Sequence, residues 1–325
     1  MEKLLEVKHL KKFYYGKKKL FSKETPSVKA INDVSFNVYR GETLGVVGES
    51  GCGKSTMGRT VLRLLEPTSG EILYEGKDIC KLSKEEMRLM RQKMQIIFQD
   101  PYASLNPRMT VKELIQAPLD AFTKLSAEEK LEKVKEIMAL VGLQEEWLEK
   151  YPHEFSGGQR QRIVIARALI LNPEFIFCDE PVSALDVSVR AQVLNLLKDI
   201  QKEKKLTYLF VSHDLSVVRF LCDRIMVMYL GRVVELGSRN DIYEHAGHPY
   251  TQILLSAIPV ADVDVKTKPV IIEGDVPSPY SPPSGCLFHT RCPKTCEKCK
   301  KEIPELKEVS KGHFVACHLY AEDKK

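Results

Sequence analysis

A glycine-rich run at residues 48–55 has the residue types and the spacing of a phosphate-binding loop. It consists of Gly48-Glu-Ser-Gly-Cys-Gly-Lys-Ser55 and matches the pattern G-x-x-x-x-G-K-[ST]. An apolar stretch at 44–47 precedes it, and we expect a helix at 56–65, which is the strand, loop and helix succession that the motif requires. Backbone N–H groups of such a loop surround phosphate oxygens, the lysine adds positive charge, and the final hydroxyl binds Mg²⁺. The residues expected to hold a nucleotide here are Gly48, Ser50, Gly51, Cys52, Gly53, Lys54, Ser55 and Thr56.

Two adjacent carboxylates end an apolar run further along the chain. The run is Phe175-Ile-Phe-Cys, and it is followed directly by Asp179 and Glu180. At the end of a parallel strand, Asp179 would reach a bound Mg²⁺, and Glu180 would accept a proton from an attacking water. A solvated turn after a strand is the alternative interpretation, and the phosphate loop in the same chain favours the catalytic one.

A second anion-binding motif lies between these two. In Phe155-Ser-Gly-Gly-Gln-Arg-Gln-Arg-Ile, two glycines open a helix, so backbone amides and the Ser156 hydroxyl form another phosphate cradle. Since two cradles of one subunit do not wrap a single γ-phosphate, we expect two subunits to pair head to tail, each completing the other's site. We expect Arg160 and Arg162 to lie at an interface or in solvent rather than on nucleic acid.

These motifs, with others in the same order and spacing, resemble the ATP-binding subunits of ABC transporters. The resemblance extends from Tyr14 to about Pro259. It includes Phe155, where the family usually has leucine, which is another apolar anchor. The other matching segments are Ile97-Phe-Gln99-Asp, the signature Ser156-Gly157-Gly158-Gln159, Ser183-Ala-Leu-Asp186 and Val211-Ser-His213-Asp.

The resemblance assigns a role to several of these residues. ATP would be the nucleotide, with Mg²⁺ held by Ser55, Gln99 and Asp179. Gln99 would also couple the site to membrane subunits. The signature residues and Asp186 would act across a dimer interface, and His213 would touch the γ-phosphate. Tyr14 would stack on adenine, although its aromatic neighbours at 13 and 15 leave a core aromatic as the alternative.

Two stretches and the C-terminal tail are similar to oligopeptide and dipeptide importers, in the form of the second of their two ATPase subunits. They are residues 99–108, residues 248–259, and the tail motifs Gly285-Cys-Leu-Phe and Arg291-Cys-Pro. The similarity implies two integral-membrane permease subunits, a second homologous ATPase subunit, a substrate-binding protein, and a location at the cytoplasmic face of the cell membrane. Nickel and glutathione importers share these features, so the solute stays open. A soluble ABC ATPase acting on nucleic acid, with a zinc-binding tail, is a further alternative.

Five of the nine cysteines lie in the tail. Cys286, Cys292, Cys299 and Cys317 follow C-x5-C-x6-C-x17-C, and Cys296 is a fifth candidate. Four thiolates suit either Zn²⁺ or an iron–sulfur cluster, and cysteine identity does not choose between them. The resemblance to the importers implies a [4Fe–4S] cluster on those four, with a structural role, and leaves Cys296 outside the pattern.

Composition and patterning indicate an α/β fold. The chain has 325 residues, of which 43% are hydrophobic and 29% charged, typical of a globular protein. A net charge of +5 is too mild for a dedicated nucleic-acid binder, and we find no apolar run long enough to span a bilayer and no secretory signal. We expect a P-loop ABC nucleotide-binding domain at 1–259, with a mixed sheet core and a helical subdomain at about 100–170, and a cysteine-rich extension at 260–325. The strands are expected at 4–7, 28–38, 43–47, 70–74, 175–178, 207–211, 224–229 and 232–236.

Overall fold

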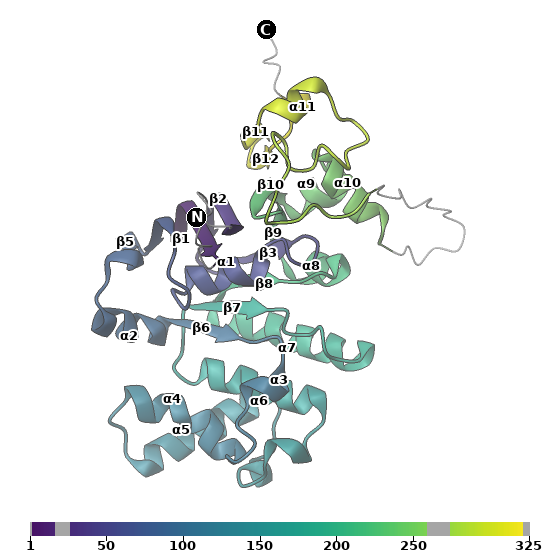
Figure 1. Ribbon diagram of the computed structural model, residues 1–325. Helices are drawn as coiled ribbons and strands as arrows, with labels where there is room; N and C mark the ends of the chain where they lie inside the picture. The colour runs from purple at the N-terminus through teal and green to yellow at the C-terminus, as the bar shows by residue number, and fades with distance from the viewer. Residues whose placement is uncertain (1, 17–26, 259–273, 321–325) are drawn as a thin grey trace. The chain divides into compact units, whose positions relative to one another are not determined.

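The computed structural model describes residues 2–16, 27–258 and 274–320 (Figure 1). The chain forms two units: the first comprises residues 1–2, 38–43 and 81–212, and the second comprises residues 3–37, 44–80 and 213–325. The domain boundary expected after residue 259 lies outside the described residues, so it stays a prediction.

Three parallel strands form the sheet portion of the first unit. Strand β7 (Phe175–Asp179) lies between β6 (Met94–Ile97) and β8 (Thr207–Val211). Every residue of β7 and β8 is buried, which explains their continuous apolar sequence, because strands of a parallel sheet are covered on both faces.

The other elements of this unit are helical. α4, α5 and α6 pack against one another, and α5 begins at a capping box on Ser126 and ends before Gly142, whose φ is +70°, as the sequence predicts. The helices are α2 (Lys84–Lys93), α3 (Pro101–Ser104), α4 (Val111–Phe122), α5 (Ala127–Leu140), α6 (Gly157–Leu169) and α7 (Val187–Lys204), with single 3₁₀ turns at Glu145–Trp147 and Pro152–Glu154.

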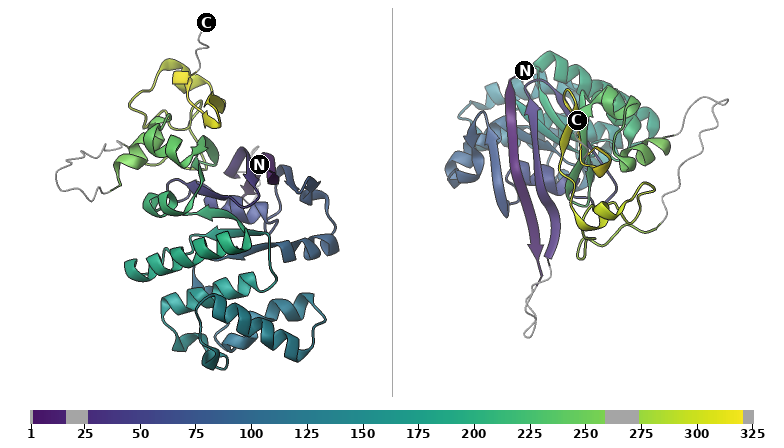
Figure 2. Two further views of the ribbon diagram at one scale, coloured as in Figure 1. Left: turned by 180° about the vertical axis from the view of Figure 1, so that it is seen from behind. Right: turned by 90° about the horizontal axis from the view of Figure 1, so that it is seen from above.

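The second unit contains two groups of strands. One is a sheet in the order β2-β1-β4-β5, in which β4 is antiparallel to both β1 and β5. The other has the order β3-β9-β10-β12-β11, in which β3 and β9 are parallel and the remaining pairs antiparallel. Figure 2, in the view from above, shows the long strands β1 and β2 side by side. The bounds are β1 (Lys3–Tyr15), β2 (Ser27–Tyr39), β3 (Thr43–Val47), β4 (Ser69–Tyr74), β5 (Lys77–Asp78), β9 (Arg224–Tyr229), β10 (Arg232–Ser238), β11 (Lys307–Ser310) and β12 (His313–Val315). The predicted mixture of parallel and antiparallel strands is therefore confirmed.

Short helices connect the strands of the second unit. The helix after the phosphate loop begins at Lys54 and ends at Val61, so it starts two residues earlier and stops four residues sooner than the sequence predicts. The helices are α1 (Lys54–Val61), α8 (Leu215–Leu221), α9 (Arg239–Glu244), α10 (Pro249–Ser256) and α11 (Glu297–Lys301), with 3₁₀ turns at Ile79–Lys81 and His318–Tyr320. Within the described part of the chain, no helix combines the length and the apolar content needed to cross a membrane.

Backbone pairing and one aromatic side chain attach the C-terminal tail to the second unit. Strand β12 pairs antiparallel with β10, with Glu235 opposite Val315 and Leu236 opposite Phe314. Phe288 is 1% exposed and packs against the rings of Tyr229 and Tyr250, with centroids 5.3 Å and 5.2 Å away. The tail thus has apolar anchors that its polar composition did not indicate.

Candidate nucleotide-binding and hydrolysis site

The phosphate loop connects β3 to α1, as the motif predicts. All three of its glycines have a positive φ: +151° at Gly48, +79° at Gly51 and +103° at Gly53. A Cβ on Gly48 would lie 2.2 Å from the carbonyl oxygen of Met228, and one on Gly53 would lie 2.2 Å from that of Ala30. Any other residue at either position would clash with backbone, so the glycines set the shape of the cradle.

The side chains of the loop are arranged around its own carbonyls. Lys54 is 5% exposed, and its Nζ donates to the carbonyl oxygens of Gly48 at 2.7 Å and Glu49 at 3.1 Å. Ser55 and Thr56 are partly exposed in the first turn of α1. Cys52 is buried, and burial raises the pKa of its thiol, so its role toward a phosphate is limited to its backbone. A glycine-rich loop at a helix N-terminus with a buried lysine fits the phosphates of a nucleoside triphosphate.

The predicted catalytic carboxylates end β7 in the first unit. Asp179 is fully buried, and Glu180 follows it with a left-handed backbone, φ +48°. The backbone N–H of Glu180 donates to the carbonyl of Val211 at 3.1 Å. Gln99, just after β6, donates from Nε2 to Oε2 of Glu180 at 3.3 Å. The structure therefore brings together two residues that the sequence separates by 81 positions.

The signature segment forms the N-terminus of α6. Ser156 and Gln159 make a capping box: the Ser156 hydroxyl accepts from the Gln159 backbone at 3.4 Å, and Gln159 Oε1 accepts from the Ser156 backbone at 3.0 Å. Ser156 is exposed, and Gly157 is half-buried. Gly158 is buried against α7, because a Cβ there would lie 2.3 Å from a methyl of Val189. The helix thus begins at the surface of this unit, with the Ser156 hydroxyl bonded to the backbone amide of Gln159 and Gly157 half-buried.

Two residues flanking the signature are buried. Phe155 packs edge-on against Trp147 with ring centroids 5.6 Å apart, which confirms the apolar anchor. Arg160 is 5% exposed, so the expectation of an interfacial or solvated side chain is wrong for it. It donates to the carbonyls of Pro152 at 2.6 Å and His153 at 3.2 Å. Alternating basic and apolar residues indicated a surface helix, but the carbonyls of the preceding turn need a buried donor.

The remaining predicted residues lie at element ends. Asp186 is exposed and directly precedes α7, and His213 is exposed after β8. Tyr14 is 41% exposed near the end of β1, with Lys12 Nζ 5.2 Å from its ring centroid. Their assigned roles at the nucleotide stay predictions. Gln99, Asp179, Glu180, the signature and Asp186 belong to the first unit, whereas the phosphate loop, Tyr14 and His213 belong to the second.

Known proteins match the chain over nearly its whole length. Residues 31–183 match the family described as ABC transporter, and residues 234–299 match the C-terminal region of oligopeptide/dipeptide transporters. The oligopeptide transport ATP-binding protein AppF of Bacillus subtilis is 54% identical over 323 residues, covering 98% of each chain. This chain belongs to the oligopeptide/dipeptide ABC transporter family. The oligopeptide transport ATP-binding protein OppF of Haemophilus influenzae is 53% identical, with 97% of each chain covered.

Solved structures agree with this family assignment. A dimeric post-hydrolysis structure of the ATP-binding cassette MJ0796, bound to ADP and Pi, aligns with a TM-score of 0.64 at 32% identity. It covers 72% of this chain and 98% of that chain. Like the other members of its family, this chain is therefore an ABC ATPase with a P-loop fold.

The tail cysteines of this ABC ATPase gather in one region. The Cys286 backbone donates to the carbonyl of Cys299 at 2.8 Å, and the neighbouring thiols of Cys292, Cys299 and Cys317 contribute to a raised pKa of Cys286. Sγ of Cys296 lies 3.4 Å from Sγ of Cys299. Burial raises the pKa of Cys286 to about 11. Among the described residues, no three histidine, cysteine or acidic side chains lie close enough to hold a metal ion.

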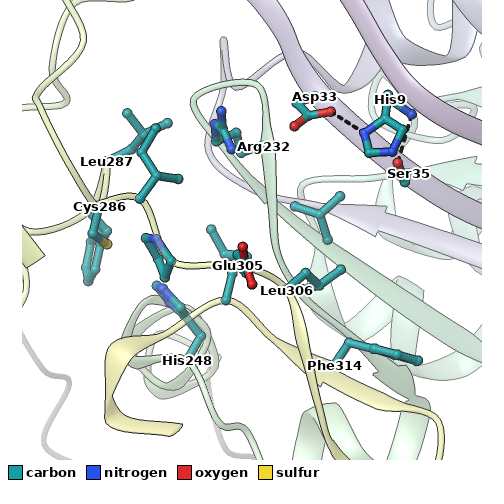
Figure 3. Close-up of a pocket in the computed structure, with 16 residues that line it drawn as sticks. His9, Asp33, Ser35, Arg232, His248, Cys286, Leu287, Glu305, Leu306 and Phe314 are labelled. Atoms are coloured by element: carbon teal, nitrogen blue, oxygen red, sulfur yellow. Dashed lines mark hydrogen bonds and ion pairs between the residues drawn. The ribbon is translucent and has the colours of Figure 1, made fainter. Parts of the chain in front are cut away.

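A cavity of about 700 Å³ separates this tail from the N-terminal strands within the second unit. Figure 3 shows His9 and Asp33 at one side of it, pointing toward one another, with Nδ1 and Oδ1 2.8 Å apart. Arg232 and Cys286 also line it, together with apolar side chains of the tail. Of the residues that the sequence singled out, Cys286 and His248 line this cavity.

Sequence reasoning missed three residues next to the phosphate loop. Glu49 occupies a variable position of the loop motif, and Arg291 forms an ion pair with it, with Nη1 2.8 Å from Oε2. Tyr250 accepts a hydrogen bond from the backbone of Glu49 at 2.8 Å. The loop motif leaves the identity of residue 49 open, and 242 positions separate it from Arg291, so a single sequence carries no signal for this contact.

Proposed function

We propose that this chain is the ATP-hydrolysing subunit that powers import of di- and oligopeptides through an ABC transporter. The observation that carries the proposal is the contact of Gln99 with Glu180 at the end of β7, in a chain that also holds a complete phosphate loop. The peptide class is supported by the likeness to AppF and OppF, which extends over almost the full length of each chain.

In the proposed mechanism, ATP binds the phosphate loop of one subunit and the signature of a second subunit. Glu180 orients the attacking water and accepts its proton at a carboxylate oxygen, while Gln99 holds that carboxylate in place. Ser55, Gln99 and Asp179 would hold Mg²⁺, which neutralises developing phosphate charge. The two-subunit arrangement is supported by the likeness to the dimeric MJ0796 structure.

Closing and reopening of two such subunits would move the membrane subunits between inward and outward access. The proposed partners are two integral-membrane permease subunits, a second ATPase subunit, either identical or homologous, and a substrate-binding protein. The chain would lie at the cytoplasmic face of the membrane. Residues 1–259 would form the ATPase domain, with a helical subdomain at about 100–170, and residues 260–325 would form the extension.

The test is ATP hydrolysis by the assembled importer. The chain is purified with the products of its neighbouring operon genes, reconstituted into vesicles, and assayed for phosphate release with and without an oligopeptide and the binding protein. We expect the peptide to stimulate release. Stimulation by nickel or glutathione with no response to any peptide would overturn the substrate class.

We further propose that Cys286, Cys292, Cys299 and Cys317 hold a [4Fe–4S] cluster that stabilises the tail. Support comes from the backbone hydrogen bond that brings Cys286 beside Cys299 and from the match of residues 234–299 to the transporter C-terminal region. Cysteine thiolates are the usual ligands of such clusters. In a [4Fe–4S] cluster each cysteine thiolate binds a different iron, so the four thiols need not lie within bonding distance of a single metal ion.

Anaerobic purification of the whole chain tests this proposal. We expect brown protein with about four irons per chain, the stoichiometry of the cluster. A Cys292→Ser variant should lose the iron, whereas Cys80→Ser, which changes a cysteine outside the tail, should keep it. Colourless protein with one zinc per chain would replace the cluster by a zinc site.

A further inference from the structure

Arg291, in the C-terminal tail, forms a direct ion pair with Glu49 of the phosphate loop. Arg291 makes a two-pronged ion pair with Glu49, with Nη1 2.8 Å from Oε2 and Nη2 3.1 Å from Oε1. Nη1 also donates to the hydroxyl of Tyr229 at 3.3 Å. The Arg291 side chain is 7% exposed and that of Glu49 is 22% exposed. A parallel, largely buried pair of this kind fixes both position and orientation of the carboxylate.

The backbone of Glu49 is held as firmly as its side chain. Its N–H donates to the hydroxyl of Tyr250 at 2.8 Å, and its carbonyl accepts from Lys54 Nζ at 3.1 Å and from the Cys52 N–H at 3.3 Å. Tyr250 is fully buried. Every polar group of Glu49 is therefore engaged, two of them by residues that lie beyond position 248 in the sequence.

These contacts bear on phosphate binding for two reasons. Lys54 supplies the positive charge of the loop, and one of the two carbonyls that orient its Nζ belongs to Glu49. The Glu49 carboxylate itself lies within a loop that receives a triphosphate, so an unpaired negative charge there would repel the ligand. Arg291 cancels that charge in a setting where solvent screens it poorly.

The linker that leads into the tail lies against the same loop. Residues 276–279 line a cavity of about 150 Å³ together with Glu49, Ser50, Gly51 and Cys52. Tyr229, which bonds to Arg291, forms another part of its wall. The tail thus meets the first half of the phosphate loop at two places, the ion pair and this cavity.

We propose that Arg291 is a positioning residue for ATP: it fixes Glu49 and neutralises its charge, which makes the C-terminal tail part of the nucleotide site. The inference rests on the proposed binding of ATP at this loop. The competing account is that the pair only fastens the tail to the unit and does not influence the nucleotide.

The test measures ATP affinity of the full chain by titration with a fluorescent ATP analogue and Mg²⁺. Arg291→Gln leaves the Glu49 charge uncompensated, and we expect the Kd to rise roughly 5- to 150-fold, the usual range of coupling between sites. Arg291→Lys keeps the positive charge but loses the second hydrogen bond to the Glu49 carboxylate. We therefore expect a Kd between those of the wild type and Arg291→Gln. Lys294→Gln removes a neighbouring tail cation, which donates to Gln252 at 3.5 Å, and its Kd should match the wild type.

A double variant separates electrostatic positioning from simple fastening. In Glu49→Gln/Arg291→Gln the repelling charge is gone, so ATP should bind at least about fivefold more tightly than to Arg291→Gln alone. In steady-state hydrolysis, Arg291→Gln should raise KM with a smaller effect on kcat, since it changes binding rather than the reacting groups.

Each negative outcome has a separate meaning. If Arg291→Gln lowers the melting temperature but leaves the Kd for ATP unchanged, the ion pair only attaches the tail to the rest of the unit, and the inference is wrong. A double variant as weak as Arg291→Gln alone would also overturn it. If the wild-type chain itself fails to bind ATP, the proposed function fails first.

Discussion

Glu180 combines two properties that suit a catalytic base. Its φ of +48° is uncommon for a residue with a side chain and is maintained by the surrounding bonds: its N–H donates to Val211, and its carbonyl accepts from the Ser183 hydroxyl at 3.1 Å. The left-handed turn directs the chain away from β7 immediately after the buried Asp179. The carboxylate is then held by Gln99, so its orientation is set before a water arrives.

Glu180→Gln should abolish turnover and leave ATP binding intact. The amide keeps the shape of the carboxylate but cannot accept the proton of the water, and loss of a general base costs about 10²–10⁴-fold in rate. The measurement is phosphate release, with size-exclusion chromatography in ATP and Mg²⁺ to detect an accumulated dimer. Glu136→Gln, at an exposed position of α5, is the control and should keep full activity. Wild-type hydrolysis by Glu180→Gln would mean that another residue is the base.

His248 gives the second unit a pH-dependent stability. It is 1% exposed, burial lowers its pKa to about 4 from 6.5, and its Nδ1 accepts from the Tyr250 backbone at 3.1 Å at the start of α10. Between pH 6.5 and 4 the unfolded chain binds a proton at this histidine and the folded chain does not. Its stabilising effect is therefore complete above pH 6.5 and is lost as the pH falls, by up to about 1.4 kcal/mol per pH unit.

His248→Asn should flatten this dependence. Asparagine keeps an acceptor at the helix start and does not titrate in this range. The free energy of unfolding is measured by urea denaturation from pH 7 to 4.5 for both proteins. We expect the difference between the two curves to shrink as the pH falls. Parallel curves would show that His248 has the same pKa in the folded and the unfolded chain, which would contradict the account.

At the scale of elements, the N-terminus of α6 has a structural role and a proposed functional role. Its capping box on Ser156 has the same form as the one on Ser126 at the start of α5. Each satisfies backbone donors of the first turn, and loss of such a cap costs about 0.5–2 kcal/mol. What distinguishes Ser156 is the pair of glycines that follows it, and we propose that the first turn of this helix binds a phosphate.

Ser156→Arg should eliminate ATPase activity and leave nucleotide binding by a single chain nearly unchanged, because in the proposed head-to-tail dimer the cradle that it blocks would serve the neighbouring subunit. Ser126→Arg is the matched control: it removes an equivalent cap and should lower stability to a similar extent while hydrolysis continues. Both are assayed for phosphate release and for ATP affinity. Full activity of Ser156→Arg would contradict the head-to-tail arrangement.

Elements were predictable where a local pattern has a single meaning. The strands at β7, β8, β9 and β10 follow from apolar runs between turns, and α5 follows from its capping box and terminal glycine. Strand β6 was hidden in a helical region, because its four residues, Met-Gln-Ile-Ile, are as compatible with a helix as with a strand. The hairpin β11–β12 was also missed, since its pairing with β10 depends on residues about 80 positions away.

At the scale of the molecule, the chemistry was more predictable than the contacts that support it. The phosphate loop, the acidic strand end and the signature are local motifs, and their residue types alone predict phosphate binding and hydrolysis. The bond between Gln99 and Glu180 required the order of the strands, because the two side chains follow neighbouring strands β6 and β7. To predict the ion pair between Arg291 and Glu49, one would need to know that the tail packs beside the loop, where Phe288 is buried.

Uptake of a labelled oligopeptide by vesicles containing the assembled importer tests the central claim most directly. ATP is supplied on the side where this chain lies, and the binding protein with its peptide on the other. We predict accumulation of the peptide with the wild-type chain and none with Glu180→Gln, which we expect to bind ATP without hydrolysing it. Equal accumulation with both chains, or accumulation of glutathione or nickel but of no peptide, would contradict the account.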